Sequence, residues 1–329
     1  MARASCSSTT QTATGWSSAP ARATSQPPAG RLNWLFVPAG VLNWPWRMAW
    51  PFRDNLGEIV FEKIQHIGYL TPDLDRAIAW FEESFSAVKA GGGPLAAGYA
   101  MPSGGRNAYV RFGNAEAELL EPVDQTGLSS EILTMHHVGY VVADINKSID
   151  ELTARGFKFA ADKPNVNVLG HQLLYFDSST TNGVKMHITQ LPDAPPEAND
   201  GLAIERIIHA GYRVKNLEEA IKWYVDNFNG SLLGGGPSRT GGKNAFVNFS
   251  EVQVELIQPP DTDAMTNDHV MDHVGYVVGD IPSCIGECEA HGLKFVSDTP
   301  NTNGVGQQVL YFETDTSMDS RMHLTRLPD

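Results

Sequence analysis

The sequence predicts an α+β protein built from four copies of one β-α-β-β-β unit. The first observation is a phrase, His-x-Gly-Tyr, that begins at His66, His137, His209 and His273. Such a recurrence indicates copies of one supersecondary unit. The second observation is that copies one and three share one set of further motifs, and copies two and four share another. The chain is therefore a pair of units that has been duplicated.

Each copy repeats the same order of predicted elements. The phrase lies in a run rich in β-branched and aromatic residues, such as 63–70 and 271–278, which is typical of a strand. An amphipathic stretch follows, in which apolar residues recur at helical spacing, as they do across 74–81 and 217–224. Two strand-like runs end each copy, for example 107–112 and 115–120.

Local signals mark where the helices begin and end. Asp73 and Asp144 are candidate N-caps directly before their helices, and Gly156 and Gly292 lie where C-caps belong. Glycine-rich segments follow the helices of copies one and three, at 91–94 and 234–237. No Lys-Ser or Lys-Thr follows them to open a helix, so they are predicted to be connectors and not phosphate-binding loops.

The longer period defines the expected domains. Copies one and three share Gly-Gly-(Arg/Lys)-Asn-Ala-(Tyr/Phe)-Val, and copies two and four share Pro-Asn-x-Asn followed by Gln-x-Leu-Tyr-Phe. We therefore expect an N-terminal extension at residues 1–58, a first pair of units at 59–194, a linker at 195–202 and a second pair at 203–329.

The strand pattern predicts which side chains face a common site. Alternate residues of a strand point to opposite faces, so the histidine and glycine of each phrase share one face and the tyrosine lies on the other. We expect the tyrosines to pack in the core and the histidine face to line a concave surface, where glycine leaves room for a ligand. The residues at the centre of the last strands are Glu118, His187, Glu255 and His323, all of which can coordinate a metal.

A β-α-β-β-β unit with a first-strand histidine and a last-strand glutamate resembles the vicinal oxygen chelate superfamily, which contains glyoxalase I, methylmalonyl-CoA epimerase, fosfomycin resistance proteins and extradiol dioxygenases. Two segments are similar to its epimerase and glyoxalase branch, 109–122, ending Glu-Leu-Leu-Glu-Pro, and 135–144. The resemblance covers about residues 62 to 328. It implies four modules that pair into two cupped, eight-stranded mixed sheets, each holding one divalent metal.

The same resemblance implies the ligands. One set would be His66, Glu118, His137 and His187, and the second would be His209, Glu255, His273 and His323. Whether neighbouring units pair or units cross between the halves is left open, and both arrangements give three histidines and one glutamate. The family usually has a glutamate where His187 and His323 stand. A neutral imidazole there leaves the cation more positive and a stronger Lewis acid, and the donor set suits Mn, Fe, Co, Ni or Zn better than Ca or Mg.

Other polar residues are assigned by their place on the strands. Glu116 and Glu121 are expected to be solvated surface residues. Three further residues could orient an anionic substrate or could simply lie at the rim of the concave surface, namely Lys185, Arg321 and Gln253. The remaining candidates are donors that hold the metal ligands in place, at Asn107, Asn244, Gln172 and Gln308.

Composition narrows the class of protein. The chain has 329 residues, 42% of them hydrophobic, enough for two ordinary cores. Its formal charge of −14 argues against nucleic acid as a partner. The three cysteines are odd in number, and Cys284 and Cys288 lie four apart on a predicted helix, which favours a reducing, cytoplasmic location over a disulfide framework.

The first 58 residues differ from the rest. Residues 1–30 are rich in Ser, Thr, Ala and Pro and should be disordered, either as an extension without function or as an organellar transit peptide. Residues 32–52 carry four tryptophans, but prolines and an arginine interrupt them, so no membrane span is expected. A hydrophobic arm that packs on the body or on another subunit of a homo-oligomer fits this segment.

The resemblance implies a small-molecule substrate with adjacent oxygens. The preferred hypothesis is an epimerase, isomerase or glyoxalase-like lyase that stabilises an enolate beside a carbonyl, with Glu118 or Glu255 as the base. The alternative is a ring-cleaving extradiol-type dioxygenase that uses Fe or Mn on a catechol, although its usual last ligand would be a glutamate where His323 stands. A non-catalytic binder, like the bleomycin resistance proteins, is the third hypothesis.

Overall fold

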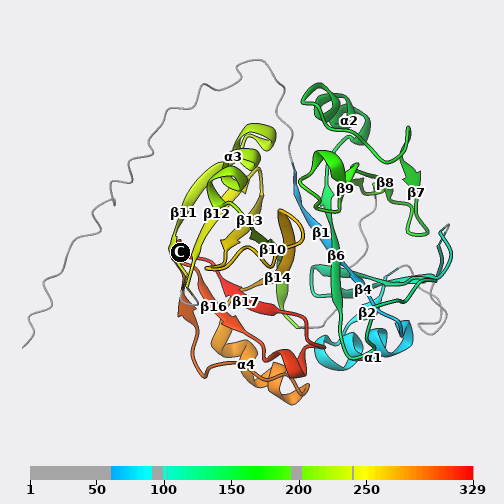
Figure 1. Cartoon of the computed structure of the whole chain (residues 1–329). Helices are drawn as coiled ribbons and strands as arrows, with labels where there is room; N and C mark the ends of the chain where they lie inside the picture. The colour runs from blue at the N-terminus through cyan, green and yellow to red at the C-terminus, as the bar shows by residue number, and fades with distance from the viewer. Residues whose placement is uncertain (1–60, 91–98, 102, 194–201, 239–240, 329) are drawn as a thin grey trace, which may run out of the picture. The chain divides into compact units, whose positions relative to one another are not determined.

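The computed structural model describes residues 61–90, 99–101, 103–193, 202–238 and 241–328 (Figure 1). The predicted extension at 1–58, the glycine-rich segment at 91–94 and almost all of the predicted linker lie outside these residues.

The first two units contain every predicted element. Unit one comprises β1 (Lys63–Leu70), α1 (Leu74–Phe85), β2 (Val88–Lys89), β3 (Tyr99–Ala100), β4 (Arg106–Phe112) and β5 (Ala115–Glu121). Unit two comprises β6 (Thr134–Val141), α2 (Ile145–Ala154), β7 (Asn165–Val166), β8 (Gln172–Tyr175), the short 3-10 helix η2 (Ser178–Thr180) and β9 (Met186–Gln190).

The third and fourth units repeat this order. Unit three comprises β10 (Ile204–Val214), α3 (Leu217–Phe228), β11 (Ser231–Pro237), β12 (Lys243–Phe249) and β13 (Val252–Gln258). Unit four comprises β14 (His269–Val278), α4 (Ile281–Ala290), β15 (Asn301–Thr302), β16 (Gln308–Tyr311), η3 (Thr314–Thr316) and β17 (Met322–Arg326).

Neighbouring units pair through their first strands. In the first half β1 runs antiparallel to β6, and each pairs in parallel with the last strand of its own unit, β5 or β9. In the second half β10 and β14 do the same with β13 and β17. The pairing left open by the sequence is therefore between neighbours, and the predicted fold of four modules in two mixed sheets is confirmed. One antiparallel pair, Ile64 with Ile207, joins β1 to β10.

The helix boundaries follow the predicted capping residues. The Oδ1 of Asp73 accepts from the amide of Arg76 at 3.0 Å, and the Oδ1 of Asp144 accepts from the amide of Lys147 at 3.0 Å. Gly156 and Gly292 follow the last helical turns with φ of +97° and +83°, a conformation that glycine adopts without a Cβ clash.

The core lies on the sheet faces that carry the tyrosines. The tyrosines of the four phrases are each at most 1% exposed, which confirms that they pack as core. Aromatic rings also join the two halves, because Phe61 packs on Tyr140, Phe228 and Phe249 with ring centroids 5.2–5.5 Å apart.

One predicted connector is a strand instead. Residues 234–237 form the end of β11 and pair with β12. A Cβ on Gly235 would stand 2.2 Å from the carbonyl oxygen of Asn244, so the glycine permits a close approach of two backbones that composition alone had assigned to a loop. Within the part of the chain that the structure describes, no helix is both long enough and apolar enough to cross a bilayer.

Candidate metal centres

Two clusters of three histidines occupy corresponding places in the two halves. In each cluster one nitrogen from every ring lies within 4.8 Å of the others. All six rings are at most 2% exposed. The first cluster is His66 on β1, His137 on β6 and His187 on β9, and the second is His209 on β10, His273 on β14 and His323 on β17.

Strand register brings these rings together. Gly68 lies opposite His137 and Gly139 opposite His66 in the β1–β6 pair, while Gly139 also lies beside His187 in the β6–β9 pair. A Cβ on Gly68 would stand 2.0 Å from the His137 ring, and one on Gly139 would stand 2.6 Å from the His187 ring. The glycine of the phrase therefore makes room for the neighbouring imidazole, where the sequence had indicated room for a ligand.

The first centre joins its histidines to one carboxylate. The Nε2 of His66 lies 3.1 Å from the Nε2 of His137 and 3.2 Å from the Nε2 of His187. The Oε2 of Glu118 lies 3.0 Å from the Nε2 of His137 and 3.4 Å from the Nε2 of His66. Four potential donor atoms thus face one point inside the first sheet.

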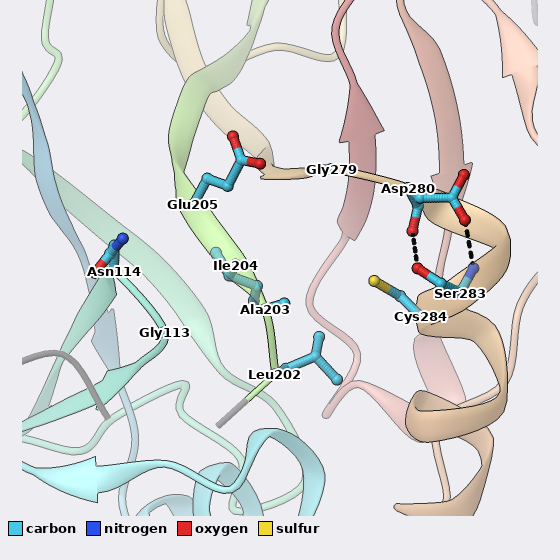
Figure 2. A pocket seen from close by; sticks show the side chains of 10 residues that line it. All are labelled: Gly113, Asn114, Leu202, Ala203, Ile204, Glu205, Gly279, Asp280, Ser283 and Cys284. Carbon is cyan, nitrogen blue, oxygen red and sulfur yellow. Dashed lines mark hydrogen bonds between the residues drawn. The ribbon is translucent and has the colours of Figure 1, made fainter. Parts of the chain in front are cut away.

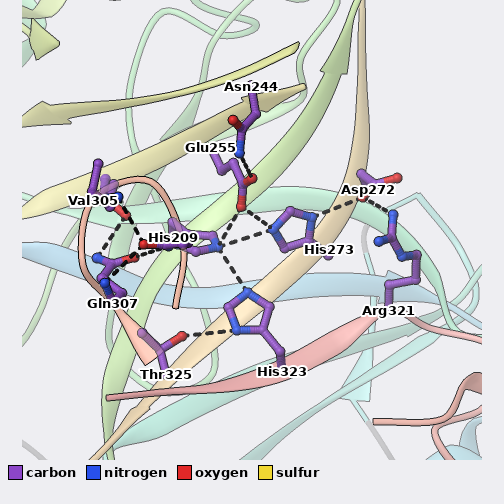
Figure 3. A network of polar contacts seen from close by, with 12 residues as sticks. His209, Asn244, Glu255, Asp272, His273, Val305, Gln307, Arg321, His323 and Thr325 are labelled. Atoms are coloured by element: carbon purple, nitrogen blue, oxygen red, sulfur yellow. Dashed lines mark hydrogen bonds and ion pairs between the residues drawn. The ribbon is translucent and has the colours of Figure 1, made fainter. Parts of the chain in front are cut away.

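The second centre has the same plan, and Figure 3 shows Glu255 aimed between two rings of its cluster. The Nε2 of His209 lies 3.1 Å from the corresponding atoms of His273 and His323. The Oε2 of Glu255 lies 3.1 Å from the Nε2 of His273 and 3.7 Å from the Nε2 of His209. The structure therefore groups the eight predicted residues into the two predicted sets of four.

Side chains behind the ligands fix their orientation. The Nδ2 of Asn107 donates to Oε1 of Glu118 at 2.6 Å, and the Nδ2 of Asn244 donates to Oε1 of Glu255 at 2.9 Å, as predicted. Thr189 lies 2.8 Å from Nδ1 of His187, and Thr325 lies 3.0 Å from Nδ1 of His323. These contacts leave Oε2 of each glutamate and Nε2 of each of these histidines directed at the centre.

Burial and hydrogen bonding set the charge of the ligands. Burial acts to raise the pKa of the Glu118 carboxyl, but hydrogen bonds from His137 and His66 outweigh it and hold that pKa well below its usual range. Burial holds the pKa values of His187 and His323 well below the usual range, so both rings are neutral. A neutral imidazole and an ionised carboxylate are the forms that bind metals.

His273 differs from His187 and His323 in the direction of its pKa shift. Burial acts to lower its pKa, but its hydrogen bonds to Asp272 and Glu255 dominate and raise the pKa to about 9. Asp272 itself, although burial opposes ionisation, is held by His273, Arg321 and Arg213 at a pKa of about 2. The second centre therefore holds an ionised carboxylate on each side of this one ring.

Glu116 was assigned wrongly to the solvated surface. It is 6% exposed and its Oε1 lies 3.9 Å from Nδ1 of His66. Gln65 Nε2 donates to its Oε1 at 3.3 Å, and Arg111 lies 3.3 Å from its Oε2. A register shift between Ile64 and His66 turns the side chain of Gln65 inward, next to Glu116. Strict alternation along a strand could not foresee this position for Gln65.

Two of the predicted supporting donors were wrong by one residue. Gln172 is exposed and Gln308 half-buried, whereas their neighbours His171 and Gln307 are buried. His171 lies 2.8 Å from Gln65, and Gln307 donates to Gln253 at 3.3 Å. The shared Gln-x-Leu-Tyr-Phe motif marked the strand correctly but not the face that its first residue takes.

The second half carries neutral residues at the positions that correspond to Glu116 and the residues around it in the first half. Gln253 and Gln307 occupy the places of Glu116 and His171, while Asn248 and Ile208 occupy those of Arg111 and Gln65. Gln253 is 2% exposed, so its side chain is buried and does not lie at the rim of the concave surface. In the first half Glu116, Arg111 and His171 also line a cavity of about 400 Å³.

A further cavity of about 540 Å³ lies away from both centres (Figure 2). It is lined by the turn at Gly113, by the start of β10 and by the first turn of α4. Its Asp280 is used as the N-cap of α4, accepting from the amide of Ser283 at 2.9 Å. Its acidic and cysteine residues do not converge on one point, because among the described residues the groups of three or more possible ligands are the two histidine clusters.

Comparison with known proteins identifies the family of the chain. A profile of the Glyoxalase/Bleomycin resistance protein/Dioxygenase superfamily matches residues 65–176 and 208–311. These two regions make up more than half of the chain, and the chain therefore belongs to this superfamily. No curated protein sequence matches it.

Several solved structures share the fold at low sequence identity. The Mn(II)-bound glyoxalase from Novosphingobium aromaticivorans is 14% identical, with a TM-score of 0.60 over 82% of this chain and 83% of its own. A 2,3-dioxygenase from Pseudomonas sp. KL28 is 12% identical, with a TM-score of 0.58 over 84% of this chain and 94% of its own. A mutant of 4-hydroxymandelate synthase from Streptomyces coelicolor is 12% identical, with a TM-score of 0.57 over 80% and 92%. At these identities the likeness shows the fold and no particular reaction.

Proposed function

We propose that the protein is a divalent-metal-dependent enzyme that binds two adjacent oxygens of a small carbonyl or hydroxycarbonyl substrate and moves a proton on the neighbouring carbon. The observation that carries the proposal is the pair of buried clusters, each with three imidazoles and one carboxylate. Members of the superfamily include a glyoxalase with bound Mn(II). Epimerase, isomerase or lyase chemistry fits this description.

The residues present fit a transition metal. Ligands at right angles around an ion with bonds of about 2.2 Å stand about 3.1 Å apart. The Nε2 atoms of His66, His137 and His187 meet that spacing at 3.1 and 3.2 Å, as do those of the second centre at 3.1 Å. Without a shared cation, several imidazoles and a carboxylate packed this closely and this deeply would be costly to bury. Imidazole with one carboxylate suits Mn, Fe, Co, Ni or Zn.

His66, His137, His187 and Glu118 would hold one ion, and His209, His273, His323 and Glu255 a second. When bound, the cation supplies positive charge to two substrate oxygens and so stabilises the enolate that forms when the adjacent carbon loses its proton. Three neutral imidazoles and one carboxylate leave a divalent ion with a net charge near +1, which favours an anionic substrate oxygen.

Glu118 and Glu255 are the proposed bases. Each has its Oε1 fixed by an asparagine amide, and its Oε2 is the atom directed at the histidines. Oε2 of Glu118 or Glu255 would take the proton from the substrate carbon after loosening from the ion, and would return it to complete an isomerisation.

Exchange of carbon-bound hydrogen tests this proposal. The protein, loaded with Mn²⁺ or Zn²⁺, would be incubated in D₂O with a panel of small hydroxycarbonyl and dicarbonyl compounds and followed by proton NMR. The proposal predicts metal-dependent deuterium uptake next to a carbonyl with at least one compound. A variant that carries both Glu118→Gln and Glu255→Gln should bind metal yet lose the exchange. Exchange that is unchanged in this double variant would contradict the role of the glutamates.

A second candidate is extradiol-type ring cleavage with Fe or Mn. The observation in its favour is the histidine-rich ligation of each centre in a chain of four units. Oxygen consumption with catechols, measured with an oxygen electrode on Fe²⁺-loaded protein, would favour this reaction. Deuterium exchange in the absence of oxygen would favour the first.

A further inference from the structure

The two centres differ in the residue that precedes one ligand. His136 comes before His137 in the first centre, and Asp272 comes before His273 in the second. Each of these residues contacts the Nδ1 atom of the ligand that follows it, at 3.0 Å for His136 and 2.9 Å for Asp272. The contact lies on the side of the ring opposite to the centre, so it decides which ring nitrogen carries the hydrogen.

In the second centre this contact prepares the ring for a metal. A carboxylate only accepts hydrogen bonds, so Nδ1 of His273 must donate to Asp272, and Nε2 is the nitrogen left to bind an ion once its own hydrogen, which faces Glu255, has been displaced. Arg321 and Arg213 hold Asp272 from behind, the latter with its Nε at 3.2 Å. Figure 3 shows Asp272 between Arg321 and His273, joined to both, with the other histidines on the far side of the His273 ring.

In the first centre the corresponding hydrogen bonds run in the opposite direction. The Nζ of Lys185 lies 2.8 Å from Nε2 of His136. A lysine ammonium only donates, so Nε2 of His136 accepts, and the hydrogen of that ring sits on Nδ1. Nδ1 of His136 therefore donates to Nδ1 of His137, and the hydrogen of His137 sits on Nε2. That nitrogen lies 3.0 Å from Oε2 of Glu118, which accepts from it.

We propose that the two centres have unequal metal affinity: Asp272 makes the second centre the tight one, and the Lys185–His136 pair makes the first centre the weak one. This inference rests on the proposed function, because it assumes that both clusters hold metal. A metal entering the first centre must displace the hydrogen on Nε2 of His137 and break the whole donor chain. A metal entering the second centre also displaces a hydrogen, from Nε2 of His273, but it leaves the contact between Nδ1 of His273 and Asp272 intact, the carboxylate–histidine–metal arrangement that strengthens a ligand. Loss of such a partner typically costs 10- to 100-fold in affinity.

Competition for Zn²⁺ between the full-length protein and a chromophoric chelator measures this difference. His323→Ala leaves only the first centre intact, and His187→Ala leaves only the second. The inference predicts that the His187→Ala protein binds Zn²⁺ about 10- to 100-fold more tightly than the His323→Ala protein. Equal affinities, or the opposite order, would overturn it. Zn²⁺ binding at neither centre in the unmutated protein would overturn the proposed function itself.

Substitutions at Asp272 and at Lys185, with opposite expected effects on Zn²⁺ affinity, assign the cause. In the His187→Ala background, Asp272→Asn should weaken Zn²⁺ binding about 10-fold or more, and Asp272→Glu should restore part of it. In the His323→Ala background, Lys185→Met removes the exposed ammonium that donates to His136 and so sets the direction of the hydrogen bonds. This substitution should tighten Zn²⁺ binding. Because Lys185 is on the surface, this variant should fold normally. Unchanged affinity in both Asp272→Asn and Lys185→Met would show that these contacts do not set the difference.

Discussion

Replacing the glycine of one phrase by alanine should remove one metal centre while the fold survives. A Cβ on Gly211 would stand 2.1 Å from Cε1 of His273, where ordinary contact begins at 3.4 Å. The ring must therefore move by about 1.3 Å, whereas metal–ligand distances tolerate about 0.2 Å. The obstructing atoms belong to the end of a side chain, so His273 can swing away without moving a strand.

The cost to the metal-free protein should be moderate. Moving His273 breaks its buried contacts with Glu255 and Asp272. Buried polar groups left without partners cost about 1–3 kcal/mol. We therefore expect the free energy of unfolding of the Gly211→Ala protein to fall by about 1–3 kcal/mol in urea, and its metal content to fall from two ions per chain to one.

Gly286→Ala is the matched control. Gly286 lies in α4, and nothing stands within 4 Å of the position that a Cβ would take there. The same chemical change should therefore leave both ions bound and stabilise the helix by about 0.5–1 kcal/mol. If the Gly211→Ala protein kept two ions with unchanged affinity, the role assigned to the glycine would be refuted.

Three further predictions concern stability. Phe228→Ala should lower the free energy of unfolding by about 3–5 kcal/mol, measured by urea denaturation, because this ring packs between the halves against Phe61 at 5.4 Å. Asp144→Ala should cost about 1 kcal/mol through loss of the N-cap of α2, whereas Asp150→Ala on the exposed face of that helix should not. The metal-free protein should lose stability as the pH falls from about 6.5 towards 4, as unfolding curves at several pH values would show. Burial lowers the pKa of several histidines in the folded protein, so between about pH 6.5 and 4 the unfolded chain binds protons that the folded chain does not. Each such proton lowers the free energy of unfolding by about 1.4 kcal/mol per pH unit. His273, with its pKa raised to about 9, adds stability below 6.5 that is lost only as the pH rises through 9, so it does not alter the slope in the acid window. A flat or rising profile between 6.5 and 4 would contradict this. The histidines concerned are His136, with a pKa of about 3, and His171, His209 and His269, each with a pKa of about 4.

The sequence predicted the fold and the membership of both clusters because both depend on strand periodicity. A fourfold phrase fixes which strands are equivalent, and period-two alternation fixes which of their residues share a face. Glu118 and His187 could therefore be identified from their place on the last strands alone. The pairing of neighbouring units could not, because either arrangement gives the same set of ligand types.

The errors arose where the local backbone departs from the regular pattern. Alternation places Glu116 on the same face as Glu118, but the partner that the register shift at Gln65 turns towards it could not be foreseen, so a buried charged group was taken for a solvated one. The contrast between His136 and Asp272 was visible in the sequence, but its meaning depends on which atoms Lys185 and Arg321 reach. Only the three-dimensional arrangement shows the direction of these hydrogen bonds. Those from Lys185 through His136 donate towards the first centre, and the one from His273 to Asp272 donates away from the second.

Elemental analysis combined with anomalous diffraction from metal-loaded crystals is the decisive test of the two metal centres. We predict two transition-metal ions per chain, one between His66, Glu118, His137 and His187 and one between their counterparts in the second half, with bonds of about 2.0–2.3 Å. Protein that takes up no stoichiometric metal, or that holds it away from these eight side chains, would contradict both proposed centres.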